Sequence, residues 1–158
     1  MNDKEFSDLR DEILGLSMKW IRATGLSQWM IDFVWKREPG AVLDESNSVM
    51  TFRSAEVSCS WRYMHATLTF YVPSVADYID KEPVVDREER LETLVLHELC
   101  HLLVNETRQD EDQESHEERV VTQLANAFLW ARNYWLGSRD NKPLSTSVDN
   151  VDTTVLSS

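Results

Sequence analysis

The sequence predicts an α+β fold with an N-terminal helix, a small and mostly antiparallel sheet, and then two further helices. Two patterns predict this class. Apolar residues recur at three- and four-residue steps over residues 3–23, 86–104 and about 115–137, which is the periodicity of amphipathic helices. Between the first two of these segments, apolar and polar residues alternate or β-forming residues cluster, which is typical of strands.

The first helix and the first strand have clear limits. Residues 3–23 form the helical pattern, and Gly25 marks its end because glycine readily adopts the left-handed conformation that follows many helices. Residues 29–36 then alternate between two faces and predict a strand. Pro39 and Gly40 are expected to stop it.

The middle of the chain contains more β-forming sequence and then a helix start. Residues 49–61 predict one strand or a pair of strands, and residues 64–72 predict another. Asp86, followed by Glu89 three positions later, has the spacing of a capping box. We therefore expect the second helix to begin there and to run to about Val104.

The last helix is expected to begin at a second capping pair, Ser115 and Glu118, and to stop at Gly137. Its apolar face should consist of Val121, Leu124, Ala125, Phe128, Leu129 and Trp135. Residues 138–158 are rich in Ser, Thr, Asn and Asp, which predicts a flexible tail after a single domain over residues 1–137.

Composition limits the function classes. Sixteen Lys and Arg residues against 28 Asp and Glu residues give a formal charge of −12, which disfavours binding to nucleic acid or to anionic membranes. No segment approaches the roughly 18 consecutive apolar residues of a membrane span, and the acidic start does not resemble a signal peptide. We expect a cytoplasmic protein in which Cys59 and Cys100 are free thiols.

The strongest chemical signal is His97-Glu98-Leu99-Cys100-His101. All other residues from 94 to 104 are apolar or Cys, so this helix should be buried, and buried ionisable groups need partners. His97 and His101 lie one helical turn apart and can bind one Zn²⁺ together. Glu98, beside them, can take a proton from metal-bound water. The alternative is three core residues satisfied by their neighbours.

This motif resembles that of the zincin metallopeptidases, and the order of strands, motif helix and following helix is similar to their minimal core over residues 64–135. Val104 and Thr107 stand where the longer metzincin form has Gly and His, which excludes that branch. The chain looks more like the gluzincin branch, small phage-encoded metallopeptidase-like proteins and, more distantly, the ImmA/IrrE and SprT-like proteins. This resemblance implies a zincin-like fold with zinc as cofactor.

The resemblance to gluzincins also implies that the third metal ligand is a Glu of the next helix. Glu117 and Glu118 both lie one turn before Val121, near the apolar face. We expect Glu118 to be the ligand, with Glu117 as the alternative, partly because Thr122 could orient Glu118. His116 is a further alternative for the third ligand.

In zincins a strand edge near the metal holds the substrate backbone, so the resemblance suggests a cleft between residues 64–72 and the motif helix. His65 or Tyr71 could contact the transition state there, and packing at the surface is the alternative for both.

We therefore expect a zinc-dependent metallohydrolase, most simply a peptidase acting on a protein or peptide, with His97, His101 and Glu118 as ligands and Glu98 as the base. The alternative is a catalytically weak or inactive, metal-stabilised interaction module with an acidic surface. A DNA-linked protease of the SprT-like kind is disfavoured, because the sequence has neither zinc-ribbon cysteines nor a basic patch. The substrate and the oligomeric state stay open.

Overall fold

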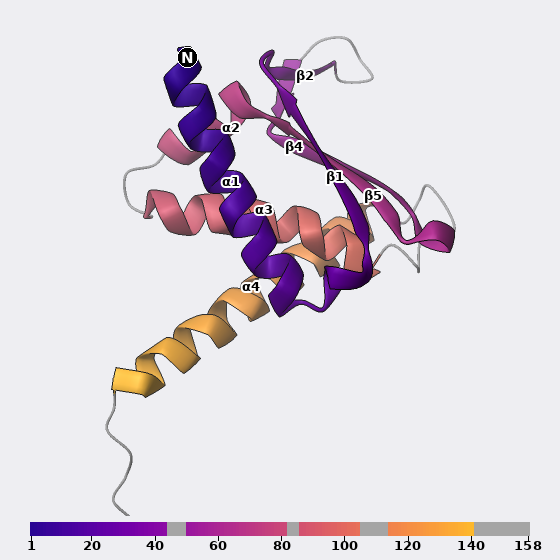
Figure 1. The fold of residues 1–158 in the computed structure, drawn as a ribbon, viewed down its shortest axis with the longest axis vertical. Coiled ribbons are helices and arrows are strands. Elements are labelled where there is room, and N and C mark those ends of the chain that lie inside the picture. The colour runs from indigo at the N-terminus through magenta and orange to yellow at the C-terminus, as the bar shows by residue number, and fades with distance from the viewer. Residues whose placement is uncertain (44–49, 82–85, 105–113, 141–158) are drawn as a thin grey trace, which may run out of the picture.

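The structure, a computed structural model, describes residues 1–43, 50–81, 86–104 and 114–140 (Figure 1). In chain order its elements are α1 (Asp3–Ala23), the short 3₁₀ helix η1 (Leu26–Gln28), β1 (Met30–Lys36), β2 (Gly40–Leu43), β3 (Met50–Arg53), β4 (Ala55–Ser60), the 3₁₀ helix η2 (Trp61–Tyr63), β5 (His65–Tyr71), α2 (Val72–Asp80), α3 (Arg87–Val104) and α4 (Glu114–Asp140). The fold is α+β, as predicted.

Helix α1 has the limits that the sequence predicts, and both ends have a local cause. At its start, the Asn2 side chain accepts a hydrogen bond from the Glu5 backbone at 2.9 Å, and the Glu5 carboxylate accepts one from the Asn2 backbone at 2.8 Å. This reciprocal capping satisfies two helix-terminal N–H groups. After the helix, Gly25 adopts a φ of 77°, which glycine reaches without steric cost.

The sheet is mixed rather than mostly antiparallel. Its three strands have the order β1-β5-β4, with β1 parallel and β4 antiparallel to the central strand β5, while β2 and β3 form a separate antiparallel pair. Two of the three described strand pairings are antiparallel, which agrees with the expectation. The three-stranded sheet that carries the core, however, has one parallel and one antiparallel pairing. The prediction was wrong there because a hydrophobic pattern locates a strand without giving its direction. The long connection from β1 to β5 allows the parallel pairing.

Two elements, β2 and α2, were not predicted from the sequence. Pro39 and Gly40 were expected only to stop the first strand, and β1 does end before them at Lys36, but Gly40 also begins β2. A Cβ atom at this position would clash with the Arg53 carbonyl oxygen and the Tyr71 ring, so only glycine allows this close approach. Pro73 lies in the first turn of α2, where the missing N–H of proline breaks no helical hydrogen bond.

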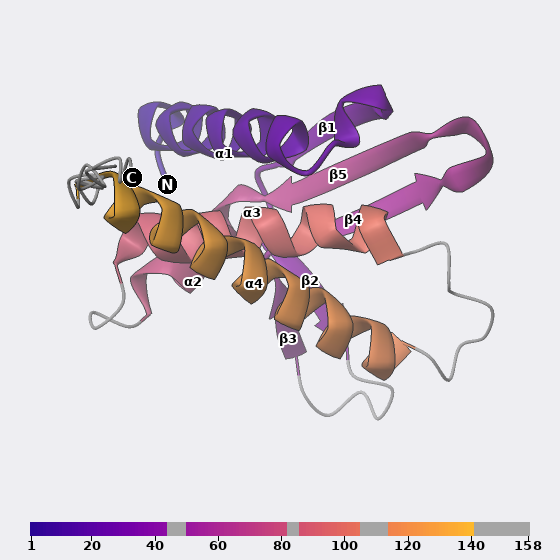
Figure 2. The same cartoon turned by 90° about the horizontal axis from the view of Figure 1, so that it is seen from below.

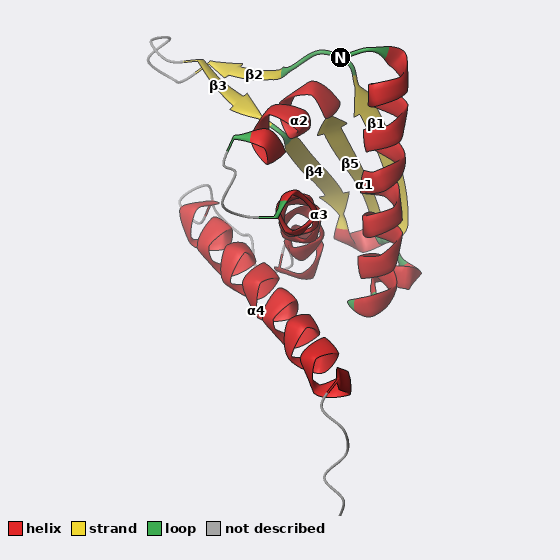
Figure 3. Ribbon diagram, turned by 90° about the vertical axis from the view of Figure 1, so that its left-hand side faces the viewer, coloured by secondary structure: helices red, strands yellow, loops and turns green. Residues whose placement is uncertain are grey.

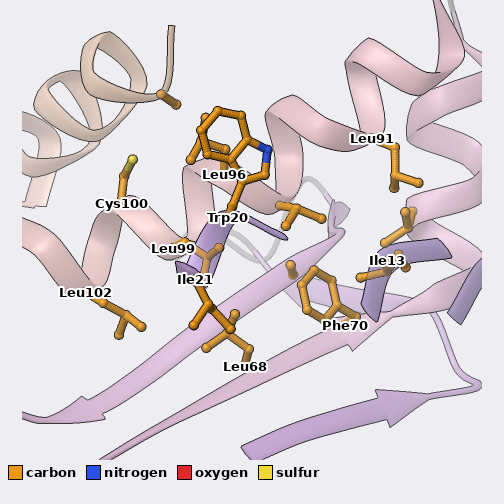
Figure 4. Packing of buried hydrophobic residues seen from close by; sticks show 14 of the residues in the cluster. Ile13, Trp20, Ile21, Leu68, Phe70, Leu91, Leu96, Leu99, Cys100 and Leu102 are labelled. Carbon is orange, nitrogen blue, oxygen red and sulfur yellow. The ribbon is translucent and has the colours of Figure 1, made fainter. Parts of the chain in front are cut away.

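Helix α3 occupies the centre of the molecule. Figure 2 shows it between α1 and α4, and Figure 3, which views it nearly end-on, places it beside the sheet. Apolar side chains from α1, β5 and α3 meet in one core, which includes Ile13, Trp20, Ile21, Leu68, Phe70, Leu91, Leu96, Leu99, Cys100 and Leu102 (Figure 4). The predicted start of α3 is confirmed, since the Asp86 side chain accepts a hydrogen bond from the Glu88 backbone at 3.2 Å.

Helix α4 departs from its predicted limits at both ends. It begins at Glu114, so Ser115 lies inside the first turn instead of preceding the helix as its cap. It also continues through Gly137 to Asp140, because a glycine costs a helix only about 1 kcal/mol and does not stop it. The rest of the predicted tail, residues 141–158, lies outside the described residues.

The face of α4 that packs on α3 is largely the predicted one. Val121, Ala125 and Leu129 are buried, and Leu124 and Phe128 are partly buried. Trp135 is 70% exposed, so placing it on the buried face was wrong. The reason is visible in Figure 1, where the second half of α4 extends beyond the other elements. None of the helices in the described ranges is long and apolar enough to cross a bilayer.

Candidate metal centre and pocket

Helix α3 turns the polar residues of its motif to one side. His97 and His101, one turn apart, have ring centroids 5.0 Å apart, while Leu99 and Cys100 point into the core. Glu98 and His101 are buried, and His97 is partly exposed. Neither Cys59 nor Cys100 is in a disulfide bond, as predicted, and burial raises the pKa of Cys100 to about 12, which leaves that thiol unreactive.

Helix α4 brings Glu118 to the two histidines. One carboxylate oxygen of Glu118 lies 3.2 Å from Nε2 of His97, and the other lies 3.4 Å from Nε2 of His101. One potential ligand atom from each of the three residues lies within 4.8 Å of the others. Two imidazole nitrogens and a carboxylate are a donor set that suits a divalent metal such as zinc and leaves one position for water. The residues present therefore fit the expected metal.

The structure gives Glu117 a different place from Glu118. Oε1 of Glu117 lies 2.9 Å from Nδ1 of His101, on the ring edge away from the nitrogen that faces Glu118. A carboxylate in this position fixes the ring orientation of a metal-binding histidine and raises its basicity. Thr122, which we expected to orient a ligand, is exposed. His116 lies in the first turn of α4, and its side chain is outside what the structure describes.

The motif residues of α3 and the two glutamates of α4 line a pocket of about 330 Å³. This volume is within the size range of ligand sites. Its described lining consists of Arg53, Ala55, Glu56, Val57, His97, Glu98, His101, Glu117 and Glu118. The wall opposite the helices is therefore β4 with the end of β3. The expected cleft against residues 64–72 was wrong, because β5 is the central strand and β4 occupies the edge next to α3.

Burial sets the protonation of the pocket residues. It raises the pKa of Glu98 to about 7, while the nearby His101 acts in the opposite direction and Glu118 adds to the rise. Burial and the neighbouring His101 together lower the pKa of His97, which favours the neutral imidazole that a metal requires. A carboxyl group with a pKa near 7 can both accept and release a proton at neutral pH.

His65 and Tyr71 lie outside the pocket lining. Nε2 of His65 is 2.9 Å from the Asp32 carboxylate, at the far end of β5. The Tyr71 hydroxyl donates a hydrogen bond to Glu56 at 3.1 Å, so it reaches the pocket only through that residue. A contact of either residue with the transition state stays a prediction.

The pocket also contains two residues that sequence reasoning missed. Arg53, the last residue of β3, forms an ion pair with Glu56 of β4 at 2.9 Å, and both line the pocket. No local motif marks them, because they lie far from the histidines in sequence. A strand pattern on residues 49–61 gives their element but not their distance from α3.

Comparison with known proteins adds no relative. A scan against protein-family models finds no match, and searches of the curated proteins and of the solved structures find no significant match. The interpretation of this pocket therefore depends on the residues of the chain itself.

Proposed function

We propose that this protein is a zinc-dependent hydrolase of the zincin type that cleaves peptide bonds. The single observation that carries the proposal is the convergence of His97, His101 and Glu118 beside the buried carboxyl group of Glu98. A chance cluster of core residues would not need a pocket, a third potential ligand from another helix and the further carboxylate of Glu117 beside His101.

In the proposed mechanism, His97, His101 and Glu118 hold the metal and Glu117 orients His101. When bound, zinc would lower the pKa of a water molecule and polarise the substrate carbonyl. Glu98 takes a proton from the attacking water. It then returns the proton to the leaving amine nitrogen, for which its pKa near 7 is suitable.

A peptide substrate is favoured by the wall opposite the helices. Within the described strands, β4 pairs only with β5, so its other edge faces the side of α3 and the pocket. An extended peptide can add to such an edge through main-chain hydrogen bonds, which would place its carbonyl groups along the pocket.

The first test is metal content. The wild-type protein should hold one Zn²⁺ per chain after zinc supplementation and dialysis, and His97→Ala and His101→Ala should lose it. At zinc concentrations one hundred times the dissociation constant, the ion should stabilise the wild type by about 2.7 kcal/mol against unfolding. Well under half an equivalent of zinc in the wild type would contradict the proposal.

The second test separates a hydrolase from an interaction module. Wild type and Glu98→Gln are incubated with host-cell lysate, and new protein termini are compared by mass spectrometry. Glu98→Gln should keep its zinc but lose at least about a hundredfold in cleavage rate, because an amide cannot accept the proton. Glu89→Gln, an exposed substitution on the same helix, is the matched control. Identical terminus profiles with zinc bound in all three proteins would favour the metal-stabilised interaction module.

A further inference from the structure

Arg53 is the one Lys or Arg residue in the described lining of the pocket. Its side chain is 47% exposed and stands at the rim, at the corner between β3 and β4. The remaining charged residues of this lining are carboxylates or the two histidines. Among the described side chains of this lining, Arg53 is thus the permanent cation that a negatively charged group in the pocket can contact.

The arginine is held in place on both its backbone and its side chain. Glu56 accepts from Nη1 of Arg53 at 2.9 Å and from the Tyr71 hydroxyl at 3.1 Å. Gly40 packs so tightly against the Arg53 carbonyl and the Tyr71 ring that no Cβ would fit between them. Fixing a long side chain before binding reduces the entropy that binding costs.

The chemistry of the two sides of the pocket differs. Glu98, Glu117 and Glu118 would repel a substrate carboxylate on the helix side. A guanidinium group binds carboxylates with two parallel hydrogen bonds and has five N–H donors, so one ion pair with Glu56 leaves donors for a second carboxylate. Apart from the proposed metal itself, which can bind one carboxylate, the strand side therefore offers the favourable contact to a further carboxylate of the substrate.

We propose that Arg53 is a specificity-determining residue that binds a carboxylate of the substrate close to the bond that is cleaved. The carboxylate would belong either to an acidic side chain or to the C-terminus of a peptide. This inference rests on the proposed function of the metal centre, since it places the carboxylate relative to that centre.

The test compares two small probes that differ by one carboxylate. Cobalt(II) replaces zinc so that binding is followed in the visible spectrum, and the probes are 2-benzylsuccinate and 3-phenylpropanoate. In the wild type the dicarboxylate should bind at least about tenfold more tightly. Arg53→Gln should reduce this ratio to about one and leave both cobalt affinity and 3-phenylpropanoate affinity unchanged.

Further variants keep the test decisive if Arg53→Gln fails to fold. Arg53→Lys keeps the charge but not the planar fork, so it should lose part of the ratio. Glu56→Gln keeps an oxygen that can accept from Arg53 but removes the competing negative charge, so it should increase the ratio. Arg62→Gln, which changes an exposed arginine outside the pocket lining, is the matched control and should have no effect.

The outcomes distinguish this inference from the proposed function. The role of Arg53 would be overturned by equal affinities of the two probes in the cobalt-loaded wild type, or by an unchanged ratio in Arg53→Gln. Neither result would contradict the proposed metal centre. Failure of the wild type to bind cobalt would overturn the proposed function itself. In the lysate experiment, cleavage beside Asp or Glu would identify a side-chain carboxylate, and loss of C-terminal residues would identify a terminal one.

Discussion

Helix α3 buries two glutamates in very different surroundings. Glu92, 2% exposed, accepts hydrogen bonds from Lys19 at 2.7 Å and from the indole of Trp20 at 2.8 Å, and it forms an ion pair with Arg132. Glu98, 7% exposed, lines the pocket, and no hydrogen bond from the described part of the chain reaches its carboxylate. One carboxylate is surrounded by donors from two other helices, and the other faces a pocket that contains further acids.

The comparison teaches that burial alone does not assign a role to an acidic residue. A buried carboxylate with two cations and an indole N–H around it has its charge satisfied and joins elements of the fold. A buried carboxylate without such partners has a raised pKa and is available for proton transfer. Of the three predictions that follow, in order of decreasing effect, the first two test this difference and the third compares the two glutamates that α4 contributes to the pocket.

Removing Glu92 should cost the most stability. Glu92→Ala leaves the charges of Lys19 and Arg132 without their partner, and breaking a buried ion pair in this way typically costs about 3–5 kcal/mol. Urea unfolding of the zinc-loaded protein measures this loss. Glu89→Ala, on the exposed side of the same helix, should stay within about 0.5 kcal/mol of the wild type. Equal stabilities of the two variants would remove the structural role that we assign to Glu92.

Glu98 should instead make stability depend on pH in the metal-free protein. Its pKa is raised to about 7, so the folded state retains a proton that the unfolded chain releases near pH 4.5. Its contribution to stability is thus fully present below about pH 4.5 and is lost as the pH rises to about 7. The lowered pKa of His97 has the opposite sign, since protonation of that histidine on acidification disfavours the fold.

The difference between wild type and Glu98→Gln isolates the carboxyl group, because both proteins contain His97. The stability of the wild type relative to Glu98→Gln should fall by up to about 3 kcal/mol between pH 4.5 and pH 8. Urea unfolding with a chelator present measures it at both values. A difference independent of pH would show that Glu98 has an ordinary pKa, and the contrast with Glu92 would then lose its electrostatic basis.

The smallest expected effect separates Glu118 from Glu117. Glu118→Gln removes a charged ligand and should weaken zinc binding by at least about tenfold. Glu117→Gln keeps an oxygen that can accept from Nδ1 of His101, so its loss should be smaller, whereas Glu117→Leu should reach about tenfold. Competition with a zinc-binding dye measures all three. A larger loss in Glu117→Gln than in Glu118→Gln would exchange the two roles.

Local patterns were sufficient to predict several parts of this fold. The limits of α1, the start of α3 at Asp86 and the β-structure within residues 49–61 are determined by neighbouring residues, through caps and hydrophobic periodicity, although the sequence left open whether that segment forms one strand or two. The spacing of His97, Glu98 and His101 predicted one polar side of a buried helix for the same reason. All of these features depend on contacts within a few residues.

The features that the sequence did not reveal depend on contacts between distant segments. The parallel pairing of β1 with β5 and the position of β4 beside α3 are tertiary properties. Arg53 enters the pocket only because of that arrangement, and the partners of Glu92 come from α1 and α4. Gly40 was interpreted only as part of the stop of a strand, since the close approach that it allows is visible only in three dimensions.

Helix α4 has a consequence for how the chain is completed during synthesis. Its first turns provide Glu118, and Arg132, about 20 Å further along the helix, reaches Glu92. Domains are synthesised from the N-terminus, so α3 emerges before the segment that supplies its last cation and its third ligand. A nascent chain that ends before Arg132 lacks one of the charges that balance Glu92. Docking of α4 would then complete the charge balance around Glu92 and bring Glu118 to the histidines in one event, so the proposed metal site would form only once this helix has been synthesised.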